Sequence, residues 1–382
     1  MKRTLGLTLL LFATLFSCMR QEKPLPAELS RAESVMWEHP DSALSILRSM
    51  PQSSLSIGKN YATWALLLAQ ARDKVYGKRL PDSLNIPSSD KLVQDAMDYF
   101  EKEGDLKRMA QTYYYKGQLL KDQKKITEAM PFFLKSKEMM TKLDEPLFTY
   151  LICQSLGNMY RYQDLYEESL VQLKDAYQYA LRSGNGERIS YALSELGRTY
   201  VHKNEMDSAL FYFGKSLDNA QRLGNIELEA MAMGELGVVY NKLSQGEKAL
   251  HYTRKELDLC LQISSLHKLP QVYYKIGSAF WSLGQLDSAK VYFQKSLETD
   301  NLYTLNEAYE VLYYICVEQK LYKEAIEYNN QYLIYSDSLQ VINHAGELAE
   351  IQARYLQPII TQYFIDNKSE IWLLFLIAHS KR

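Results

Sequence analysis

The chain has 382 residues, of which 47% are hydrophobic, 44 are basic and 46 are acidic. This length and apolar content can bury a large core, and the balanced charge gives no general attraction for a polyanion, so no nucleic acid partner is expected. Tyrosine is abundant, with 30 residues, and proline is scarce, with 10, as is typical of long helices packed through large rings.

A targeting signal is expected in residues 1–17. Lys2 and Arg3 precede an apolar run, Leu5 to Phe16, that is too short to span a bilayer comfortably. The run closes on Leu15-Phe16-Ser17-Cys18, which resembles the lipobox of bacterial lipoproteins. This resemblance implies cleavage before Cys18, acylation of Cys18 and stable anchoring in a membrane through several acyl chains. An uncleaved signal anchor is the alternative.

Residues 18–106 are expected to form two degenerate helical hairpins. The apolar spacing predicts helices over Glu28 to Trp37 and Asp41 to Met50, then over Tyr61 to Val75 and Lys91 to Phe100. The second pair is joined by the extended, proline-containing connection Gly77 to Ser89.

Residues 107–337 contain a regular repeat. Each unit has a large residue three positions after a glycine, a small residue twelve positions after it and, in most units, a large apolar residue sixteen positions after it. The small and large residues lie four apart and therefore share one face of a second helix. The glycines recur every 40 residues at Gly117, Gly157, Gly197, Gly237 and Gly277.

This pattern resembles the tetratricopeptide repeat, with Leu196-Gly197 and Tyr200 in helix A and Ala209 and Phe213 in helix B. The resemblance implies an all-α, right-handed α-solenoid of antiparallel helical hairpins, with helices longer than in the usual repeat of about 34 residues. We expect Gly197 to lie against Ala209, so that a bulky residue at Gly197 overpacks the hairpin. Asn219 is expected to be exposed and insensitive to the same change.

Thr127, Asp207 and Asp287 stand just before the small residue of helix B and are expected to cap that helix. Glycosylation is the alternative interpretation, because Asp-Ser-Ala and Asp-Ser-Leu triplets resemble the O-glycosylation sequon of Bacteroidetes. These triplets begin at Asp41, Asp82, Asp207, Asp287 and Asp337.

Residues 338–382 are expected to form a C-terminal helix, Leu339 to Leu356, and a short apolar tail, Ile371 to Ala378, which is too short to cross a membrane. The order of signal, repeat array and the segment Tyr335 to Tyr355 resembles the extracytoplasmic region of Bacteroidetes tetratricopeptide sensor-regulators. In those proteins a transmembrane helix, a coiled coil and often a DNA-binding domain follow the array. A truncated paralogue of such a regulator and a stand-alone lipoprotein are both open.

No catalytic, cofactor or metal site is expected. Cys153, Cys260 and Cys316 form no close pair and are interpreted as buried small hydrophobic residues. The six histidines lack metal-ligand spacing, and no phosphate-binding glycine motif or nucleophile motif occurs. An enzyme would need a pair of poised groups, and none is evident.

A solenoid of this kind binds partners along its concave face, which the A helices line. The fifth, ninth and twelfth positions of each A helix, counted with the glycine as eighth, should face that surface. The candidate partner-binding residues are Tyr114, Gln118, Gln154, Asn158, Arg161, Ser194, Arg198, His202, Asn241, Tyr274 and Trp281.

Asn158, Arg161, Arg198 and His202 should form one polar cluster suited to carboxylates or a peptide backbone. Pairing of the arginines with acidic neighbours such as Asp164 and Glu195 is the alternative, and Tyr274 with Trp281 is either an apolar end of the groove or packing.

The function expected from the sequence is that of an exported, lipid-anchored scaffold or sensor in the cell envelope, on the periplasmic side or the outer membrane, that binds a protein or peptide. The alternative is a SusD-like glycan- or nutrient-binding outer-membrane lipoprotein. Such proteins carry long insertions between helices, and here the only sizeable one is Gly77 to Ser89.

Overall fold

The structure is a computed structural model that describes residues 25–51, 55, 58–76 and 89–340. The described residues are helical and contain no strand. No helix among them is long and apolar enough to span a membrane. Cys18, most of the connection Gly77 to Ser89 and nearly all of the predicted C-terminal helix and tail lie outside the described residues.

The chain divides into two compact units, Met1–Tyr115 and Lys116–Arg382. In the first unit, α2 packs on α3 and α4 packs on α5, so each pair forms a helical hairpin. Trp64 fixes the second hairpin to the first, because its indole Nε1 donates a 2.9 Å hydrogen bond to the carbonyl oxygen of Leu47. The helices are α2 (Ala27–Val35), α3 (Pro40–Ser49), α4 (Lys59–Tyr76), α5 (Ser89–Glu103) and the first part of α6 (Leu106–Asp122).

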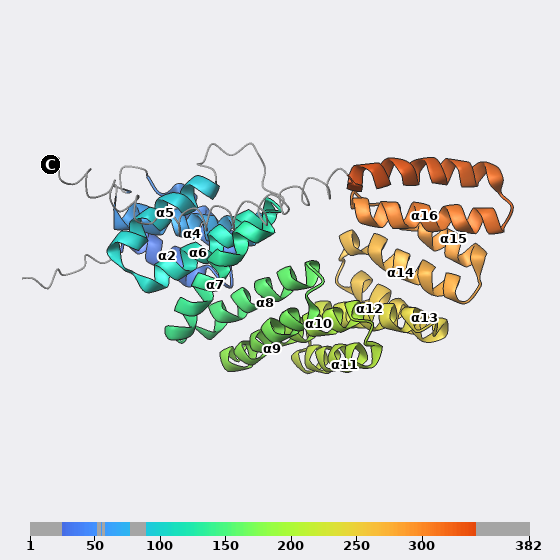
Figure 1. Ribbon diagram of the computed structural model, residues 1–382, viewed down its shortest axis with the longest axis horizontal. Coiled ribbons are helices and arrows are strands. Elements are labelled where there is room, and N and C mark those ends of the chain that lie inside the picture. The colour runs from blue at the N-terminus through green and yellow to red at the C-terminus, as the bar shows by residue number, and fades with distance from the viewer. Residues whose placement is uncertain (1–24, 52–54, 56–57, 77–88, 341–382) are drawn as a thin grey trace, which may run out of the picture. The chain divides into compact units, whose positions relative to one another are not determined.

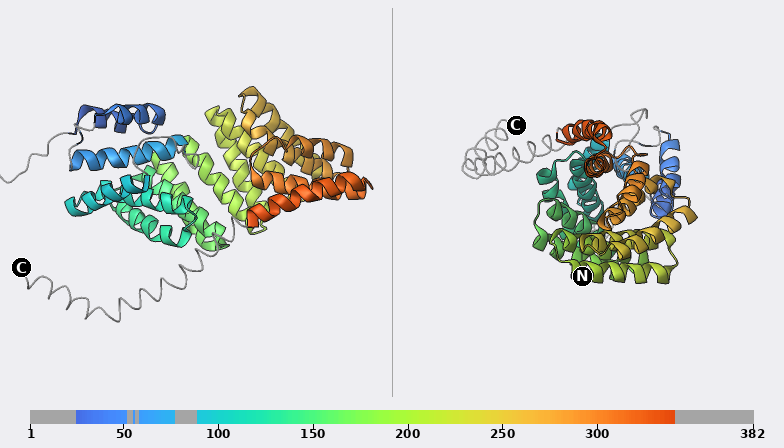
Figure 2. Two further views of the ribbon diagram at one scale, coloured as in Figure 1. Left: turned by 90° about the horizontal axis from the view of Figure 1, so that it is seen from above. Right: turned by 90° about the vertical axis from the view of Figure 1, so that its right-hand side faces the viewer.

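The second unit is a curved stack of antiparallel hairpins (Figures 1 and 2). Its A helices, α8 (Pro146–Tyr162), α10 (Gly186–His202), α12 (Ile226–Lys242) and α14 (Leu269–Ser282), lie on the inner side of the curve. Its B helices, α9 (Tyr166–Ser183), α11 (Met206–Leu223), α13 (Gly246–Gln262) and α15 (Leu286–Lys295), lie on the outer side. The unit also contains the end of α6, α7 (Ile126–Lys142), the short 3-10 helix η2 (Leu266–Lys268), α16 (Leu302–Glu318) and a helix over residues 322–340.

The turns between helices explain the 40-residue period. One residue with a left-handed backbone occurs every 20 residues from Gly104 to Gly284, with φ between 54° and 75°. At Asp164, for example, the next amide, that of Leu165, donates a 2.9 Å bond back to Tyr160, which closes the Schellman arrangement that ends a helix. After Gly284 the next left-handed residue is Lys320, only 36 positions later, which matches the contraction of the last repeat.

The repeat glycines lie at tight contacts between the two helices of a hairpin, as predicted. However, a β-carbon on Gly197 would lie 2.6 Å from Cε1 of Phe213. Gly157 faces Leu173, and Gly237 faces Thr253 in the same way. The glycine therefore makes room mainly for the residue sixteen positions later, while the backbone oxygen of the residue twelve positions later lies 3.4 Å away at Gly157 and 3.5 Å away at Gly237.

Asn219 is not exposed, contrary to the sequence-based expectation. It is 9% exposed, and its Nδ2 donates 2.8 Å hydrogen bonds to the carbonyl oxygen of Gly186 and to Oγ of Ser190. Asn219 follows Ser216 by three positions and Phe213 by six, so it shares the face of α11 that packs on α10.

The predicted caps of the B helices were also wrong. Helices α7, α11 and α15 each begin one residue before Thr127, Asp207 and Asp287, and their N-cap residues make no side-chain capping bond. Asp207 and Asp287 instead lie in the first helical turn, where a carboxylate interacts favourably with the helix dipole. Side-chain caps occur on the A helices α10, α12 and α16, at Asn185, Asn225 and Asn301.

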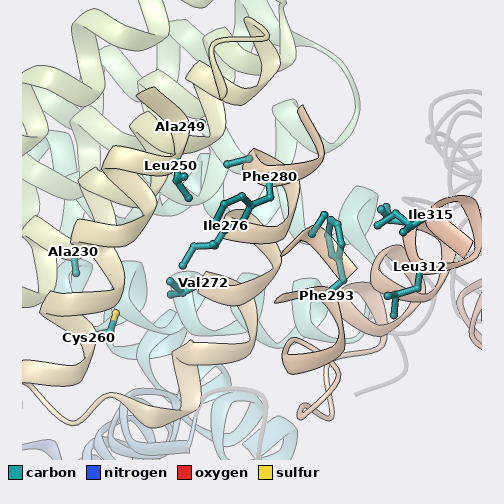
Figure 3. Packing of buried hydrophobic residues seen from close by; sticks show 13 residues of the cluster. Ala230, Ala249, Leu250, Cys260, Val272, Ile276, Phe280, Phe293, Leu312 and Ile315 are labelled. Atoms are coloured by element: carbon teal, nitrogen blue, oxygen red, sulfur yellow. The ribbon is translucent and has the colours of Figure 1, made fainter. Parts of the chain in front are cut away.

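A large apolar cluster runs from α12 to α16, with Ile276, Phe280 and Phe293 near its centre (Figure 3). Cys260 lies at its edge and is 1% exposed, while Cys153 and Cys316 are each 0% exposed. The prediction that the three cysteines are buried hydrophobic residues is confirmed.

Candidate functional site

A chain of ion pairs crosses three successive A helices on the inner side of the curve. Arg161 of α8 pairs with Glu195 of α10 at 2.7 Å, and Arg198 of α10 pairs with Glu195 at 2.7 Å and with Glu235 of α12 at 2.6 Å. The side chains of Arg161 and Glu195 are each only 9% exposed, whereas that of Arg198 is 33% exposed. Glu195 therefore holds two arginines at once.

The repeat register places these carboxylates. Glu195 and Glu235 each stand two residues before a repeat glycine, Gly197 or Gly237, so they are 40 residues apart and lie at matching points on neighbouring A helices. Lys275 occupies the same position before Gly277. From the sequence, Glu195 was expected only as an alternative partner of the arginines and Glu235 and Lys275 were not expected at the site, although all three share this position before a repeat glycine.

Burial and the ion pairs act on the pKa of Arg198 in opposite directions. Burial alone would lower the pKa of its guanidinium, but the carboxylates of Glu235 and Glu195 raise the pKa above its ordinary value. Arg161 also lies near neutral acceptors, since its Nη1 is 3.4 Å from the carbonyl oxygen of Glu195 and 3.5 Å from Oγ1 of Thr199. A buried pair of this kind leaves a costly unpaired charge when one member is removed.

Of the predicted polar cluster, the structure joins Arg161 and Arg198 through Glu195. The other proposed acidic neighbour, Asp164, instead accepts a 2.6 Å hydrogen bond from the hydroxyl of Tyr166. His202 is exposed and stacks on the ring of Tyr166, with 6.2 Å between centroids. The pKa of His202 is lowered by partial burial of the imidazole and by the positive charges of Arg161 and Lys242. The negative charge of Asp164 acts in the opposite direction.

Two of the predicted amides have an unsatisfied oxygen. The Oδ1 atoms of Asn158 and Asn241 are buried and have no hydrogen-bond partner among the described residues. Gln154 is half-buried, and the side-chain oxygen of Gln118 accepts a hydrogen bond from Lys121. A peptide amide could donate to Asn158 or Asn241.

The remaining candidates have different environments. Ser194 is 1% exposed and lies between α10 and α11, with its hydroxyl 3.0 Å from that of Ser216. The prediction that Ser194 faces the inner surface was therefore wrong. Tyr114, in the first unit, is 4% exposed and makes an edge-to-face contact with Tyr115. Tyr274 packs edge-to-face on Phe293, whereas Trp281 is 40% exposed.

The ion-pair chain leads to a cavity of about 240 Å³ lined by residues of α10, α12, α13, η2 and α14. Its charged lining residues are Arg198, Glu227, Glu235, Glu256, Lys268 and Lys275. Of these six residues, only Arg198 was predicted from the sequence as a site residue. Within the described part of the chain, no group of three or more His, Cys, Asp or Glu side chains is placed to hold a metal ion.

Comparison with known proteins agrees with this geometry. A family model described as tetratricopeptide repeat matches residues 110–139 and 270–301. The array is a tetratricopeptide-like solenoid. No curated protein sequence matches the chain.

Several solved structures share the fold. A signal transduction ATPase with a tetratricopeptide repeat sensor, from Pyrococcus horikoshii, has a TM-score of 0.62 and 15% identity; the match covers 84% of this chain but only 48% of that protein. The apo form of RapI has a TM-score of 0.60 and 13% identity over 82% of this chain and 97% of RapI. A Rap protein in complex with the Competence and Sporulation Factor has a TM-score of 0.57 and 12% identity, with coverage of 82% and 98%.

Proposed function

We propose that the chain is an exported, lipid-anchored scaffold or sensor of the cell envelope that binds a protein or peptide along the inner face of its A helices, without catalysis. The observation that carries this proposal is a pair of buried, unsatisfied side-chain oxygens on the A helices, on Asn158 in α8 and Asn241 in α12. Buried polar atoms are normally satisfied, so two such acceptors on A helices two repeats apart favour a ligand that supplies N–H donors.

The structural relatives support the same class of function. One Rap protein of this fold is in complex with the Competence and Sporulation Factor, and the archaeal relative uses its repeats as a sensor. The scaffold or sensor role proposed for the present chain is the same kind of role.

The binding face is tested by site-specific photo-cross-linking in the native envelope. A photoreactive residue replaces Trp281, which is 40% exposed on A helix α14, or Phe211, which is 55% exposed on B helix α11. A discrete cross-linked product from position 281 and none from position 211 would support the inner face. Products of equal yield, or a product from position 211 alone, would contradict it.

The lipid anchor is tested by replacing Cys18. The basic residues Lys2 and Arg3, the apolar run and Cys18 support this part of the proposal. Cys18→Ala should release the chain from the membrane fraction or leave an uncleaved precursor. Unchanged membrane attachment with an unchanged mature mass would refute the anchor.

A further inference from the structure

Glu256 is a buried carboxylate with one oxygen left unsatisfied. The residue is 6% exposed and comes from B helix α13, and it lines the charged cavity together with residues of α10, α12 and α14. Its Oε1 accepts a 2.7 Å bond from Nζ of Lys275, whereas Oε2 is buried and has no hydrogen-bond partner among the described residues.

Gly234 of α12 makes the space for this carboxylate. A β-carbon at Gly234 would lie 2.4 Å from Oε1 and 2.5 Å from Oε2 of Glu256. The missing side chain therefore lets a residue of the outer layer reach the A-helix layer. In Figure 3, Ala230 and Cys260, which also line the cavity, lie at the edge of the apolar cluster.

The cations of the cavity are already engaged. Lys275 pairs with Glu256, Arg198 pairs with Glu235 and Glu195, and Lys268 pairs with Glu227 at 2.5 Å. The carboxylate of Glu256 is nevertheless incompletely compensated, because burial raises its pKa in spite of the attraction of Lys275 and Lys268. Glu235 acts in the same direction as burial. What the carboxylate of Glu256 lacks is a second positive donor.

The size of the cavity limits that donor to a small group. Sites for whole small-molecule ligands usually enclose about 300 Å³ or more, and a water molecule accounts for about 30 Å³ in the liquid. The 240 Å³ here is suited to one extended side chain or a chain terminus.

We propose that this cavity binds a primary ammonium group, carried by a lysine side chain or by the N-terminus of a peptide, through the carboxylate of Glu256. Burial favours a proton on Glu256, and the ammonium takes the place of that proton, which is released to solvent. The carboxylate gains a charge-assisted hydrogen bond, and the net charge of the cavity stays the same. The inference deepens the proposed function, on which it rests for the identity of the ligand as a protein or peptide.

The test uses n-butylammonium, which is a lysine side chain without its backbone, in ligand-observed NMR titrations of the full-length chain. N-butylacetamide has the same stem but no charge and should bind at least about tenfold more weakly. Glu256→Gln should weaken n-butylammonium binding by about tenfold, and Gly234→Ala should abolish it by displacing the carboxylate. The matched control is Glu229→Gln, also on α12, since Glu229 does not line the cavity and should leave binding unchanged.

Two short peptides then separate the sources of the ammonium. One carries a lysine and an acetylated N-terminus, and the other has a free N-terminus and no lysine. The inference is overturned if n-butylammonium and N-butylacetamide bind equally, or if both Glu256→Gln and Gly234→Ala, shown to be folded by circular dichroism, bind n-butylammonium like the wild type. Neither result affects the cross-linking test of the inner face, so failure of the ammonium site and failure of the proposed function are distinguishable.

Discussion

Arg161 of α8 and Glu195 of α10 form an ion pair in which Nη1 and Oε2 are 2.7 Å apart and each side chain is 9% exposed. The pair links two successive repeats below the inner surface. Glu195 also pairs with Arg198, which in turn pairs with Glu235 on the next repeat. Ion pairs thus link three successive repeats, in addition to the apolar contacts between hairpins.

Glu195→Gln should lower the free energy of unfolding by about 3 to 5 kcal/mol, because it leaves Arg161 buried without its counter-charge. Arg198 retains Glu235 and should add little to this loss. The free energy is measured by chemical denaturation. Glu205→Gln is the control, since Glu205 is 44% exposed in its pair with Lys203 and should cost less than about 1 kcal/mol. Equal denaturation midpoints for the two variants would contradict a structural role for the buried pair.

The glycine register predicts opposite effects for one substitution at two helical positions. At Gly197 an added β-carbon would lie 2.6 Å from the ring of Phe213, so Gly197→Ala should cost about 1 to 3 kcal/mol through overpacking. At Gly214 in α11 nothing lies within 4 Å of the same atom, so Gly214→Ala should stabilise by up to about 1 kcal/mol through helix propensity. Thermal unfolding of both variants checks this, and a raised unfolding temperature for Gly197→Ala would show that the hairpin contact is not tight at Gly197.

The repeat architecture could be predicted because it depends on spacing. Residues such as Gly197 and Phe213 recur at fixed intervals, and a helical period converts those intervals into faces. The 20-residue spacing of the turns was harder to see, because the left-handed position is occupied by Gly184 in one turn and by Asp164 or Lys124 in others. Conformation recurs there while residue type does not.

The site was less predictable, because contacts between helices depend on side-chain reach. Arg161 and Arg198 were identified from their positions, but their shared partner Glu195 was treated only as an alternative. Glu256 could not be found from the A helices at all, since it belongs to a B helix and reaches the inner layer only because Gly234 lacks a side chain.

Glu256 should make stability depend on pH. Burial raises its pKa above the ordinary value of 4.5, so the folded state binds more protons than the unfolded state between 4.5 and the raised pKa. Stability contributed by Glu256 therefore falls as pH rises through that window. Glu256→Gln removes this titration, so its stability relative to the wild type should improve between about pH 4 and about pH 7.5. Denaturation curves of both proteins at the two pH values test the sign, and a constant difference would refute the raised pKa.

Capping of the A helices gives a matched test of the helix starts. Asn185 precedes α10, and its Oδ1 accepts a 3.0 Å bond from the amide of Arg188, which is otherwise one of the unsatisfied donors at a helix start. Asn185→Ala should therefore cost about 1 kcal/mol of stability. Gln245 occupies the N-cap position of B helix α13 without a side-chain capping bond, so Gln245→Ala should change stability by less than about 0.5 kcal/mol. Chemical denaturation of the two variants measures the difference. An equal loss at both positions would mean that the asparagine bond contributes nothing, and that α10 is held at its start by packing alone.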